Sequence, residues 1–445
     1  MSSNKHTEGI TSLLDTDLYK LTMQCAVLKH FPNVKVSYKF TNRTPQMQLT
    51  QEAFDWLHKQ IQRLGDIQVT EDEIRWLRTT CPYFSTTYLE YLRNLRLRPN
   101  EQVDLRFERR QDSSSGALSL EIHGLWDETI LYEIPLLALI SEAYFKFVDK
   151  DWNHDCQVEL AKRKGLQLLE AGCVFSEFGS RRRRDGQTHE SVMKGLTQAA
   201  QEAASQGFPG KLSGTSNVHL AMQFNVTPVG TVAHEWFMGI AALNNDYSHA
   251  NEAALRAWID TYGQGVLGIA LTDTFGTPAF LKAFARPLPE KLLSSDHMDA
   301  TYAQVFTGVR QDSGDPLEFV KLMQTFYREQ GIHEAKTIVF SDSLDVEKCI
   351  KYKKATEDAG LTASFGVGTH FTNDYKHLSK DEKSVPLNIV IKLSEANGLA
   401  AVKLSDNQGK NMGPEELVAK IKNELGYTEK KWSEGDEAHR WDGKA

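Results

Sequence analysis

The sequence lacks the features of an extracellular or membrane-spanning protein. Its five cysteines are odd in number, scattered and never in CxxC spacing, which argues against a disulfide framework and a structural zinc site. It contains no apolar run of about 18 residues, and the polar opening MSSNKHTEGI has no hydrophobic segment of a secretion signal. We therefore expect a protein of a reducing compartment, the cytoplasm and also the nucleus, with no membrane partner.

Positive charge is also in short supply. Lys and Arg number 51 against 59 Asp and Glu, a net charge of −8, so no global field favours nucleic acid and we expect no nucleic-acid partner. A local pocket can still bind a small anion. The composition, 40% hydrophobic and 25% charged, is that of a globular enzyme. The 445 residues allow two domains or one large barrel with an added piece.

The pattern of apolar and polar residues changes after the first third of the chain. Residues 1–150 mix helical and β-like runs, whereas from about residue 165 a short apolar run, a polar turn and a helix-like stretch recur. Polar or glycine markers follow these runs at intervals of 39, 39, 30 and 26 positions: His234, Asp273, Asp312, Asp342 and Gly368. This is close to the roughly 30 residues per unit of a (β/α)8 barrel. The spacing predicts an α/β class protein with an irregular, TIM-like α/β barrel.

A doubly wound open sheet is the alternative architecture, because it has the same strand-loop-helix units. The chain has no GxGxxG after the first strand of its recurring units, which weakens that alternative. In a barrel the polar markers would meet at the carboxyl ends of the strands, where active sites lie.

The helix after DSGDP is the best-marked element. Asp315 suits the cap position and Pro316 the first helical position. Five apolar residues follow at helical spacing and are expected to face the core: Phe319, Leu322, Met323, Phe326 and Tyr327.

Four consecutive arginines follow an apolar run in FGSRRRR (178–184). Guanidinium groups at a strand end can bind a carboxylate or phosphate bidentately, but a solvated charge run or a nuclear-localisation segment is an equally simple interpretation. Phe178 could stack on a planar ring or belong to the core.

Three later motifs favour a bound anion. VRQDSGDP (309–316) offers Arg310 and Asp312 beside a helix start, which suits an anion together with Mg²⁺. SDSLD (341–345) and FGVGTH (365–370) place small residues at the last barrel positions, where barrels often bind phosphate.

His234 is one of fourteen histidines, and a core histidine satisfied by hydrogen bonds is its ordinary interpretation. Its place after PVGTVA predicts a strand end near the barrel mouth, where an imidazole can attack a phosphoryl group. No second His or Cys lies at ligand spacing, which disfavours metal ligation. Asp273 and Asp342 could instead be the carboxylate pair of a barrel glycosidase, although no aromatic sugar platforms are evident near them.

Ten motifs in order from residue 12 to 410 resemble the nicotinate phosphoribosyltransferase family. They are SLLDTDLYKLTMQ, SEFGSRRRR, GTSN, GTVAHEW, ALTDTF, GVRQDSGDP, VFSDSLD, SFGVGTHFTND, PLNIVIKLSEANG and AVKLSDNQGK. The resemblance implies a type II phosphoribosyltransferase: an N-terminal α/β-sandwich domain (1–150, joined by about 385–445) beside an α/β barrel (151–384) with the active site.

The implied reaction joins nicotinate and phosphoribosyl pyrophosphate into nicotinate mononucleotide and pyrophosphate, the first step of NAD synthesis from nicotinate. It uses ATP as co-substrate and Mg²⁺, as an ATP-coupled ligase, and passes through a phosphohistidine that matches His234. Family members include dimers with shared sites, so a homodimer is an expected assembly. A sister reaction on nicotinamide or quinolinate would keep the same fold.

The resemblance also assigns residues by motif. The positions matching the nicotinate site are Tyr19, Phe178, Arg181, Ser216, Thr231 and Arg310. Those matching the phosphoribosyl pyrophosphate and phosphate region are Asn42, Arg43, Asp273, Asp312, Ser341, Asp342, Gly366, Gly368 and Thr369, with Asp312 and Asp342 as Mg²⁺ ligands. Asn42 and Arg43 would reach that region from the sandwich domain, of the same or a partner subunit.

Ser216 stands where nicotinamide-using relatives have an aspartate. A serine can donate to a carboxylate, whereas an aspartate would repel it, which favours nicotinate. One departure from the family is the stretch 285–304, longer than expected and suggestive of a surface insertion or lid.

Overall fold

The computed structural model describes residues 8–109, 114–293, 299–406 and 411–428. The chain divides into two compact units, each built from several stretches: the first from Met1–Gln24, Ser37–Val229 and Val367–Lys392, the second from Cys25–Val36, Gly230–Gly366 and Leu393–Ala445. Each unit is described by itself. The sequence-based domain boundaries near 150 and 385 stay a prediction.

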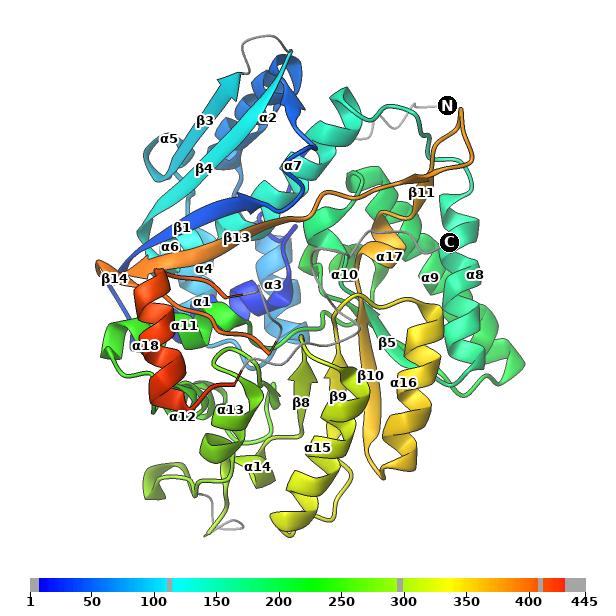
Figure 1. Cartoon of the computed structure of the whole chain (residues 1–445). Helices are drawn as coiled ribbons and strands as arrows, with labels where there is room; N and C mark the ends of the chain where they lie inside the picture. Colours follow the sequence, from blue (N-terminus) through cyan, green and yellow to red (C-terminus); the bar gives the residue numbers. More distant parts are fainter. Residues whose placement is uncertain (1–7, 110–113, 294–298, 407–410, 429–445) are drawn as a thin grey trace. The chain divides into compact units, whose positions relative to one another are not determined.

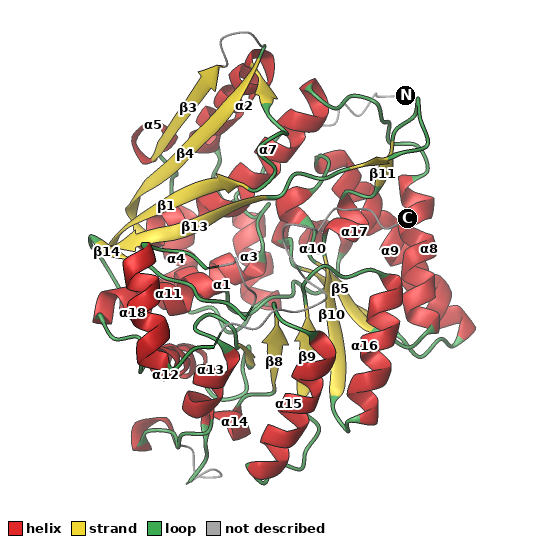
Figure 2. Ribbon diagram, viewed as in Figure 1, coloured by secondary structure: helices red, strands yellow, loops and turns green. Residues whose placement is uncertain are grey.

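Helices and strands alternate through most of the chain (Figures 1 and 2). The strands are β1 (Lys35–Asn42), β2 (Leu49–Thr50), β3 (Val103–Arg109), β4 (Ser115–Leu125), β5 (Val174–Glu177), β6 (Lys211–Thr215), β7 (Ile269–Leu271), β8 (Gly308–Gln311), β9 (Thr337–Phe340), β10 (Thr362–Val367), β11 (Tyr375–Lys376), β12 (Lys383–Ser384), β13 (Ile389–Ala396) and β14 (Leu399–Ala400). The α-helices are α1 (Leu18–His30), α2 (Gln51–Arg63), α3 (Glu71–Thr80), α4 (Thr86–Asn94), α5 (Pro99–Gln102), α6 (Trp126–Thr129), α7 (Glu133–Phe147), α8 (Gln157–Glu170), α9 (Gly186–Gln206), α10 (Val218–Phe224), α11 (His234–Asn244), α12 (Ala250–Tyr262), α13 (Thr277–Phe284), α14 (Tyr302–Val305), α15 (Pro316–Glu329), α16 (Val346–Asp358), α17 (Thr369–Thr372) and α18 (Glu415–Leu425).

The first unit combines an antiparallel sheet with a helical region. β4 pairs antiparallel with β3 over seven residues and with the short β2. In the helical region α8 and α9 pack closely because glycines lie at their contact. A Cβ on Gly195 would lie 2.3 Å from the carbonyl oxygen of Val158, and a Cβ on Gly165 would lie 2.9 Å from the Cβ of Ala199. β5 and β6 form a parallel pair in the same unit.

The second unit contains four parallel strands in sequential order. β7 pairs with β8, β8 with β9, and β9 with β10, and Figure 1 shows α15 and α16 alongside these strands. This confirms the predicted α/β class. Neighbouring strands that follow one another in sequence are what a singly wound barrel requires, and closure of the barrel stays a prediction.

Helix α15 shows why its sequence signals were informative and where they failed. Asp315 caps it as predicted, accepting from the backbone N–H groups of Leu317 and Glu318 at 2.8 and 3.0 Å. The core face is shifted by part of a turn: Val320 is buried, whereas Leu322 is 41% exposed, so the prediction for Leu322 is wrong. Helical spacing predicts which residues share a face of the helix. The apolar face of α15 is broader than the surface that it buries, so a residue at its edge stays exposed to solvent.

The stretch 285–304 is closed at its base. Pro287 and Thr301 form an antiparallel bridge, and the N–H of Leu288 donates to the carbonyl of Ala300 at 2.8 Å. Residues 294–298 of the expected insertion or lid lie outside the described residues.

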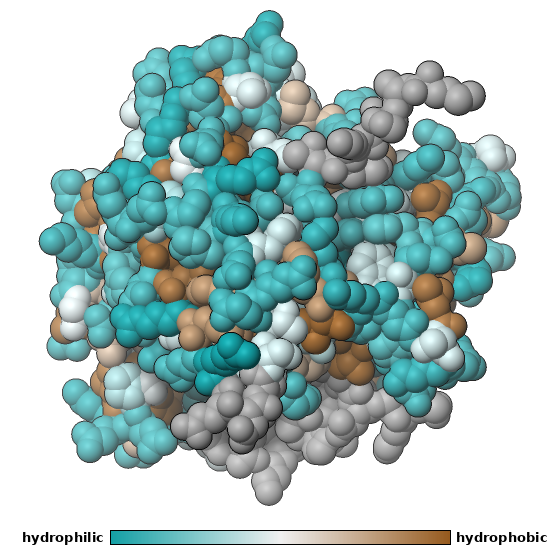
Figure 3. Space-filling model, turned by 90° about the horizontal axis from the view of Figure 1, so that it is seen from above, coloured by the Kyte–Doolittle hydropathy of each residue, from teal (hydrophilic) through white to brown (hydrophobic). Residues whose placement is uncertain are grey.

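Large apolar side chains are mostly buried. Among the described residues only five are exposed, Val266, Leu322, Ile350, Leu378 and Leu399, and hydrophilic side chains predominate on the face shown in Figure 3. No helix within the described residues is long and apolar enough to cross a membrane.

Candidate active site

Polar side chains follow three neighbouring strands of the second unit. Asp273 comes two residues after β7, Asp312 directly after β8, and Ser341 and Asp342 directly after β9. Because these strands are parallel, their carboxyl ends share one edge of the sheet. Arg310 belongs to the end of β8 itself, so the strands bring three acids, a hydroxyl and a guanidinium to that edge.

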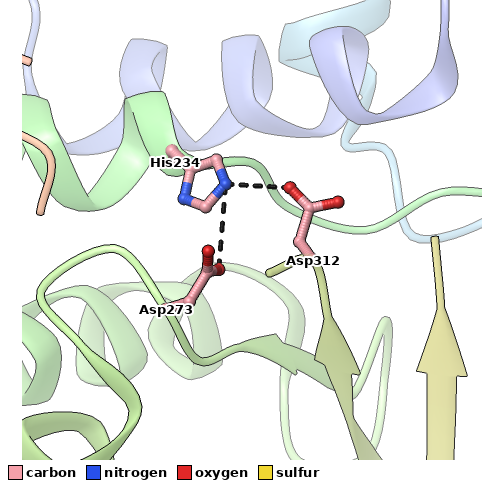
Figure 4. Close-up of side chains that lie close together, drawn as sticks. All are labelled: His234, Asp273 and Asp312. Atoms are coloured by element: carbon pink, nitrogen blue, oxygen red, sulfur yellow. Dashed lines mark hydrogen bonds and ion pairs between the residues drawn. The ribbon is translucent and has the colours of Figure 1, made fainter. Parts of the chain in front are cut away.

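His234 does not follow a strand, contrary to the sequence prediction. Residues 229–233 form no strand, and His234 is the first residue of α11. Pro228 lacks an amide N–H and Gly230 has little β preference, which accounts for the absence of a regular strand here. The ring nevertheless reaches the strand ends, because it points toward Asp273 and Asp312 (Figure 4).

The imidazole of His234 is buried, with 5% of the residue exposed, and polar or charged groups flank it. Nδ1 lies 3.0 Å from the hydroxyl of Thr274. Nε2 lies 3.0 Å from Oδ2 of Asp312 and 3.0 Å from Nζ of Lys403. Oδ1 of Asp273 is 3.8 Å from Nε2. This environment differs from that of an ordinary core histidine.

The two partners of Nε2 have opposite requirements. The Lys403 ammonium can only donate and the Asp312 carboxylate can only accept. The Thr274 hydroxyl on the other side of the ring can do either. Both neutral tautomers of His234 therefore have hydrogen-bond partners. With the proton on Nε2 the ring donates to Asp312, and with the proton on Nδ1 the lone pair of Nε2 accepts from Lys403.

Burial and the nearby Lys403 charge lower the pKa of His234 to about 4, although Asp273 and Asp312 act in the opposite direction. The imidazole is therefore neutral at neutral pH. Neutral imidazole is the nucleophilic form.

Asp312 is held in a dense hydrogen-bonding set. Its Oδ1 accepts from Nη2 of Arg310 and from Oγ of Ser341, both at 2.8 Å, and Nε of Arg310 donates to the Ser341 hydroxyl at 2.7 Å. Burial would raise the pKa of Asp312, but Arg310, His234 and Lys403 outweigh it and lower that pKa well below its ordinary value. Asp312 is thus a fixed anion.

Asp273 is the more deeply buried acid, 1% exposed. Its Oδ2 accepts from the Ser313 hydroxyl and lies 3.7 Å from Nζ of Lys403. Burial opposes ionisation, yet His234 and Lys403 lower the pKa of Asp273 overall. Its Oδ1 has no hydrogen-bond partner among the described residues.

His234, Asp273 and Asp312 could together hold a metal ion. One ligand atom from each lies within 4.8 Å of the others, and the unpartnered Oδ1 of Asp273 is an oxygen that a cation could use. The sequence argument against a metal on His234 considered only His and Cys spacing and missed these carboxylates. Lys403 already supplies one positive charge at this place.

A second polar cluster occupies the first unit. Oδ1 of Asp17 accepts from the hydroxyls of Ser180 and Ser216 at 2.6 and 2.7 Å. Burial raises the pKa of Asp17, although the charge of Arg181 and the two serine hydroxyls oppose that rise. The donor that the sequence analysis reserved for a substrate carboxylate, Ser216, is thus engaged with an acid of the protein.

The four arginines of 181–184 have separate environments and do not form one charged surface. Arg183 is buried and binds Asp15 bidentately at 2.8 and 2.7 Å. Arg184 is buried with its guanidinium 3.8 Å from the Phe145 ring centre and 4.1 Å from that of Tyr375. The exposed charge run and localisation segment are therefore wrong interpretations.

The other two arginines are less enclosed. Arg182 donates to the side chain of Asn388 at 2.8 Å. Arg181 lies 3.7 Å from Glu133 and its side chain is 36% exposed, so it is more accessible than the buried Arg183 and Arg184. It is also the one assigned to nicotinate.

The remaining predicted residues are placed as follows. In the first unit, Tyr19 is buried on α1, Phe178 and Arg181 follow β5, and Gly368 and Thr369 begin α17; in the second, Thr231 precedes α11 and Gly366 lies in β10. The side chain of Asn42 bonds within its own turn, to Thr44 and to the carbonyl of Met47, and the N–H of Arg43 donates to Asn388 at 2.8 Å. Asp342 accepts from Ser343 at 3.1 Å.

Sequence reasoning missed Lys403, Thr274, Ser313 and Asp17. Lys403 is 169 residues from His234, so no local spacing could connect the two. The only signal was its position in AVKLSDNQGK, a motif quoted for the family but given no role.

Comparison with known proteins identifies the family of the chain. The nicotinate phosphoribosyltransferase (NAPRTase) family matches residues 173–429, and its N-terminal domain matches residues 14–141. A Saccharomyces cerevisiae nicotinate phosphoribosyltransferase is 47% identical over 442 residues, 97% of this chain and 99% of that protein. A crystal structure from Saccharomyces cerevisiae covers 95% of this chain and 99% of its own, with a TM-score of 0.89 at 46% identity. A Porphyromonas gingivalis nicotinate phosphoribosyltransferase structure has a TM-score of 0.81 at 34% identity, over 94% of this chain and 100% of its own. The chain belongs to the nicotinate phosphoribosyltransferase family.

Proposed function

We propose that this chain joins nicotinate to the ribosyl carbon of phosphoribosyl pyrophosphate and releases pyrophosphate, with ATP hydrolysis coupled through a phosphohistidine on His234. The observation that carries the proposal is the buried neutral His234, whose Nε2 lies 3.0 Å from both Lys403 and Asp312. Family membership supports the base and the sugar donor.

In the transfer step, the pyridine nitrogen attacks the anomeric carbon and the bond from that carbon to pyrophosphate breaks. Positive charge develops on the ribose and negative charge on the leaving group. Arg310 lies at the end of β8 with the anionic Asp312 beside it. Arg181 has a side chain that is 36% exposed, and its guanidinium suits the nicotinate carboxylate.

In the coupling step, Nε2 of His234 attacks the terminal phosphorus of ATP, ADP leaves, and water later hydrolyses the phosphohistidine. The proton on Nδ1 stays with the ring, held at the Thr274 hydroxyl. Lys403 donates to Nε2 beforehand and lies where it can pair with the transferred phosphoryl group.

Mg²⁺ would be held by Asp312 with Asp273 or Asp342, and when bound it would neutralise phosphate charge. The unpartnered buried oxygen of Asp273 fits such an ion.

A cytoplasmic location is proposed with the rest of the function.

The test is one coupled assay with nicotinate, nicotinamide and quinolinate as alternative bases, each with and without ATP. We expect pyrophosphate release with nicotinate, stimulated by ATP and dependent on Mg²⁺. Release with nicotinamide or quinolinate alone would assign the chain to a sister reaction, and activity unaffected by ATP would remove the coupling step.

A further inference from the structure

Two loops of the first unit, assigned to different substrates, are hydrogen-bonded to each other. We call residues 178–184 the base loop, since it holds Phe178 and Arg181, and residues 368–374 the phosphate loop, since it holds Gly368 and Thr369. They are about 190 residues apart in sequence. The N–H of Phe178, the first residue of the base loop, donates at 2.8 Å to the carbonyl of Val367, which directly precedes the phosphate loop.

Thr372 bonds to the base loop at two points. Its hydroxyl donates to the carbonyl of Gly179 at 2.9 Å, and its own carbonyl accepts from the N–H of Arg184 at 3.0 Å. These two points bracket the base loop almost from end to end. Thr372 is fully buried, so water cannot readily replace either bond.

Gly179 fits this contact closely. A Cβ there would lie 2.2 Å from Oγ1 and 2.4 Å from Cγ2 of Thr372. The φ of Gly179 is −97°, an angle open to any residue, so it is the space taken by Thr372 that requires glycine. Gly368 is less tightly confined, since a Cβ there would lie 3.1 Å from the carbonyl oxygen of Phe178.

The phosphate loop has support on both sides. The buried Asn373 donates from Nδ2 to the carbonyl of Arg182 at 2.8 Å, which adds another bond to the base loop. On the other side, Lys164 of α8 donates to the carbonyl of His370 at 2.6 Å and pairs with Asp374. The loop is thereby fixed between α8 and the base loop.

We propose that Thr372 is a positioning residue that makes the base loop and the phosphate loop move as one body, so that binding of one substrate orders the site for the other. This inference rests on the proposed function and on the residue positions implied by the family resemblance, which place nicotinate at one loop and phosphoribosyl pyrophosphate at the other. A rigid link between two sites gives each ligand part of the ordering that the other needs, which appears as positive coupling of their affinities.

The test measures initial rates of the full-length protein over a grid of nicotinate and phosphoribosyl pyrophosphate concentrations. The coupling factor is the fold-decrease in KM for one substrate when the other is raised to saturation. We expect wild type to show a factor well above one. Thr372→Val keeps the shape but removes the hydroxyl, and should reduce the factor about three- to tenfold, the equivalent of one buried hydrogen bond. Thr372→Ser keeps the donor and should restore it.

A second variant guards against misfolding of the first. Asn373→Ala removes the bond to the Arg182 carbonyl and should also lower the coupling factor, while thermal unfolding reports whether each variant is folded. A wild-type factor of one, or an unchanged factor in both folded variants, overturns the inference. The proposed function fails separately, if wild type releases no pyrophosphate with nicotinate at any point of the grid.

Discussion

At the scale of single residues, the charge environment of His234 distinguishes it from the other histidines that the structure describes. Its ring is close to one ammonium and two carboxylates, and burial with Lys403 holds its pKa at about 4. The folded protein therefore keeps His234 neutral in a range where an unfolded chain, with a histidine pKa of about 6.5, binds a proton. This group makes the native state less stable as pH falls from about 7 toward 4.

We predict that the His234 ring titrates near pH 4 and that Lys403→Met raises its pKa, because a neighbouring positive charge is removed. Ring NMR signals recorded over pH, assigned by their loss in His234→Asn, measure this. A matched control is Lys420→Met, which removes a charge from the solvent-facing side of α18 and should leave the pKa unchanged. Titration near 6.5 in wild type would contradict the geometry of the buried ring.

Ser216 is the residue whose sequence-based role the structure complicates. Its hydroxyl donates to Asp17 at 2.7 Å, so it can serve a nicotinate carboxylate only by giving up that bond.

For Ser216→Ala we expect the KM for nicotinate to rise about ten- to a hundredfold, the loss of one hydrogen bond to a charged group, with little change for nicotinamide. Ser216→Thr keeps the hydroxyl and is the control. Steady-state kinetics with both bases decide the matter. Equal changes for the two bases would mean that Ser216 only holds Asp17.

At the scale of elements, the segment after Lys403 supports the His234 site from outside the strands. Gly276 precedes α13 and has no side chain to cap it. Asp406 does so instead, accepting from the N–H of Thr277 at 2.9 Å and from the Thr277 hydroxyl at 2.5 Å. The N–H of Asp406 donates to Ser313, whose hydroxyl in turn donates to Asp273. One short segment thus carries both Lys403 and the support of Asp273.

We predict that Asp406→Ala destabilises the protein by about 1–2 kcal/mol, the usual cost of a lost helix cap, and also lowers activity. Asp406→Asn can keep both contacts with Thr277 and should retain most of the stability at low pH. Urea unfolding of the three proteins measures this, and equal stability of the Ala variant and wild type would show that the cap is dispensable.

The stability difference between Asp406→Asn and wild type should also change with pH in a definite direction. Burial and the nearby Asp273 raise the pKa of Asp406 to about 6. The folded state therefore holds a proton that the unfolded chain, with an Asp pKa of about 3.9, has released. Stability from this group is present below about pH 4 and is lost as pH rises through 6. Relative to wild type, Asp406→Asn should be more stable at pH 7.5 than at pH 4.5, and the reverse order would be contrary to the assigned burial.

Much at the element scale could be predicted from sequence, for identifiable reasons. The strands before Asp273 and Ser341 are short, largely apolar runs ended by polar residues, and α15 carries its own cap, so local signals suffice. Other features depend on distant segments: the position of Lys403 depends on a contact 169 residues away. The arginine run illustrates the same limit, because only the positions of Asp15 and Phe145 decide which guanidinium groups are buried.

At the scale of the whole molecule, the family resemblance implies a homodimer with shared sites, and it assigns Arg43 to a site of the same or a partner subunit. If each site of a homodimer takes residues from both subunits, one variant can lack the residue from one subunit and a second variant the residue from the other. Two such inactive variants should complement each other. We predict that mixing and refolding His234→Asn with Arg43→Ala restores about a quarter of wild-type activity, as random pairing of two chains with one intact site per heterodimer requires.

Activity of the mixture equal to the mean of the two separate variants would contradict a shared site. Sedimentation of each variant alone serves as the control for assembly. The same experiment with His234→Asn and Thr274→Val, which damage one contact between neighbouring side chains, should show no complementation.

Acid-labile phosphate mapping tests whether His234 carries a phosphoryl group in the working enzyme. The full-length protein is incubated with Mg²⁺ and ATP labelled in its terminal phosphate, digested without acid, and the labelled peptide identified. We predict label on the peptide containing His234, absent in His234→Asn and discharged when nicotinate and phosphoribosyl pyrophosphate are added. A protein that synthesises nicotinate mononucleotide with ATP-stimulated rates but carries no label on His234 would contradict the account.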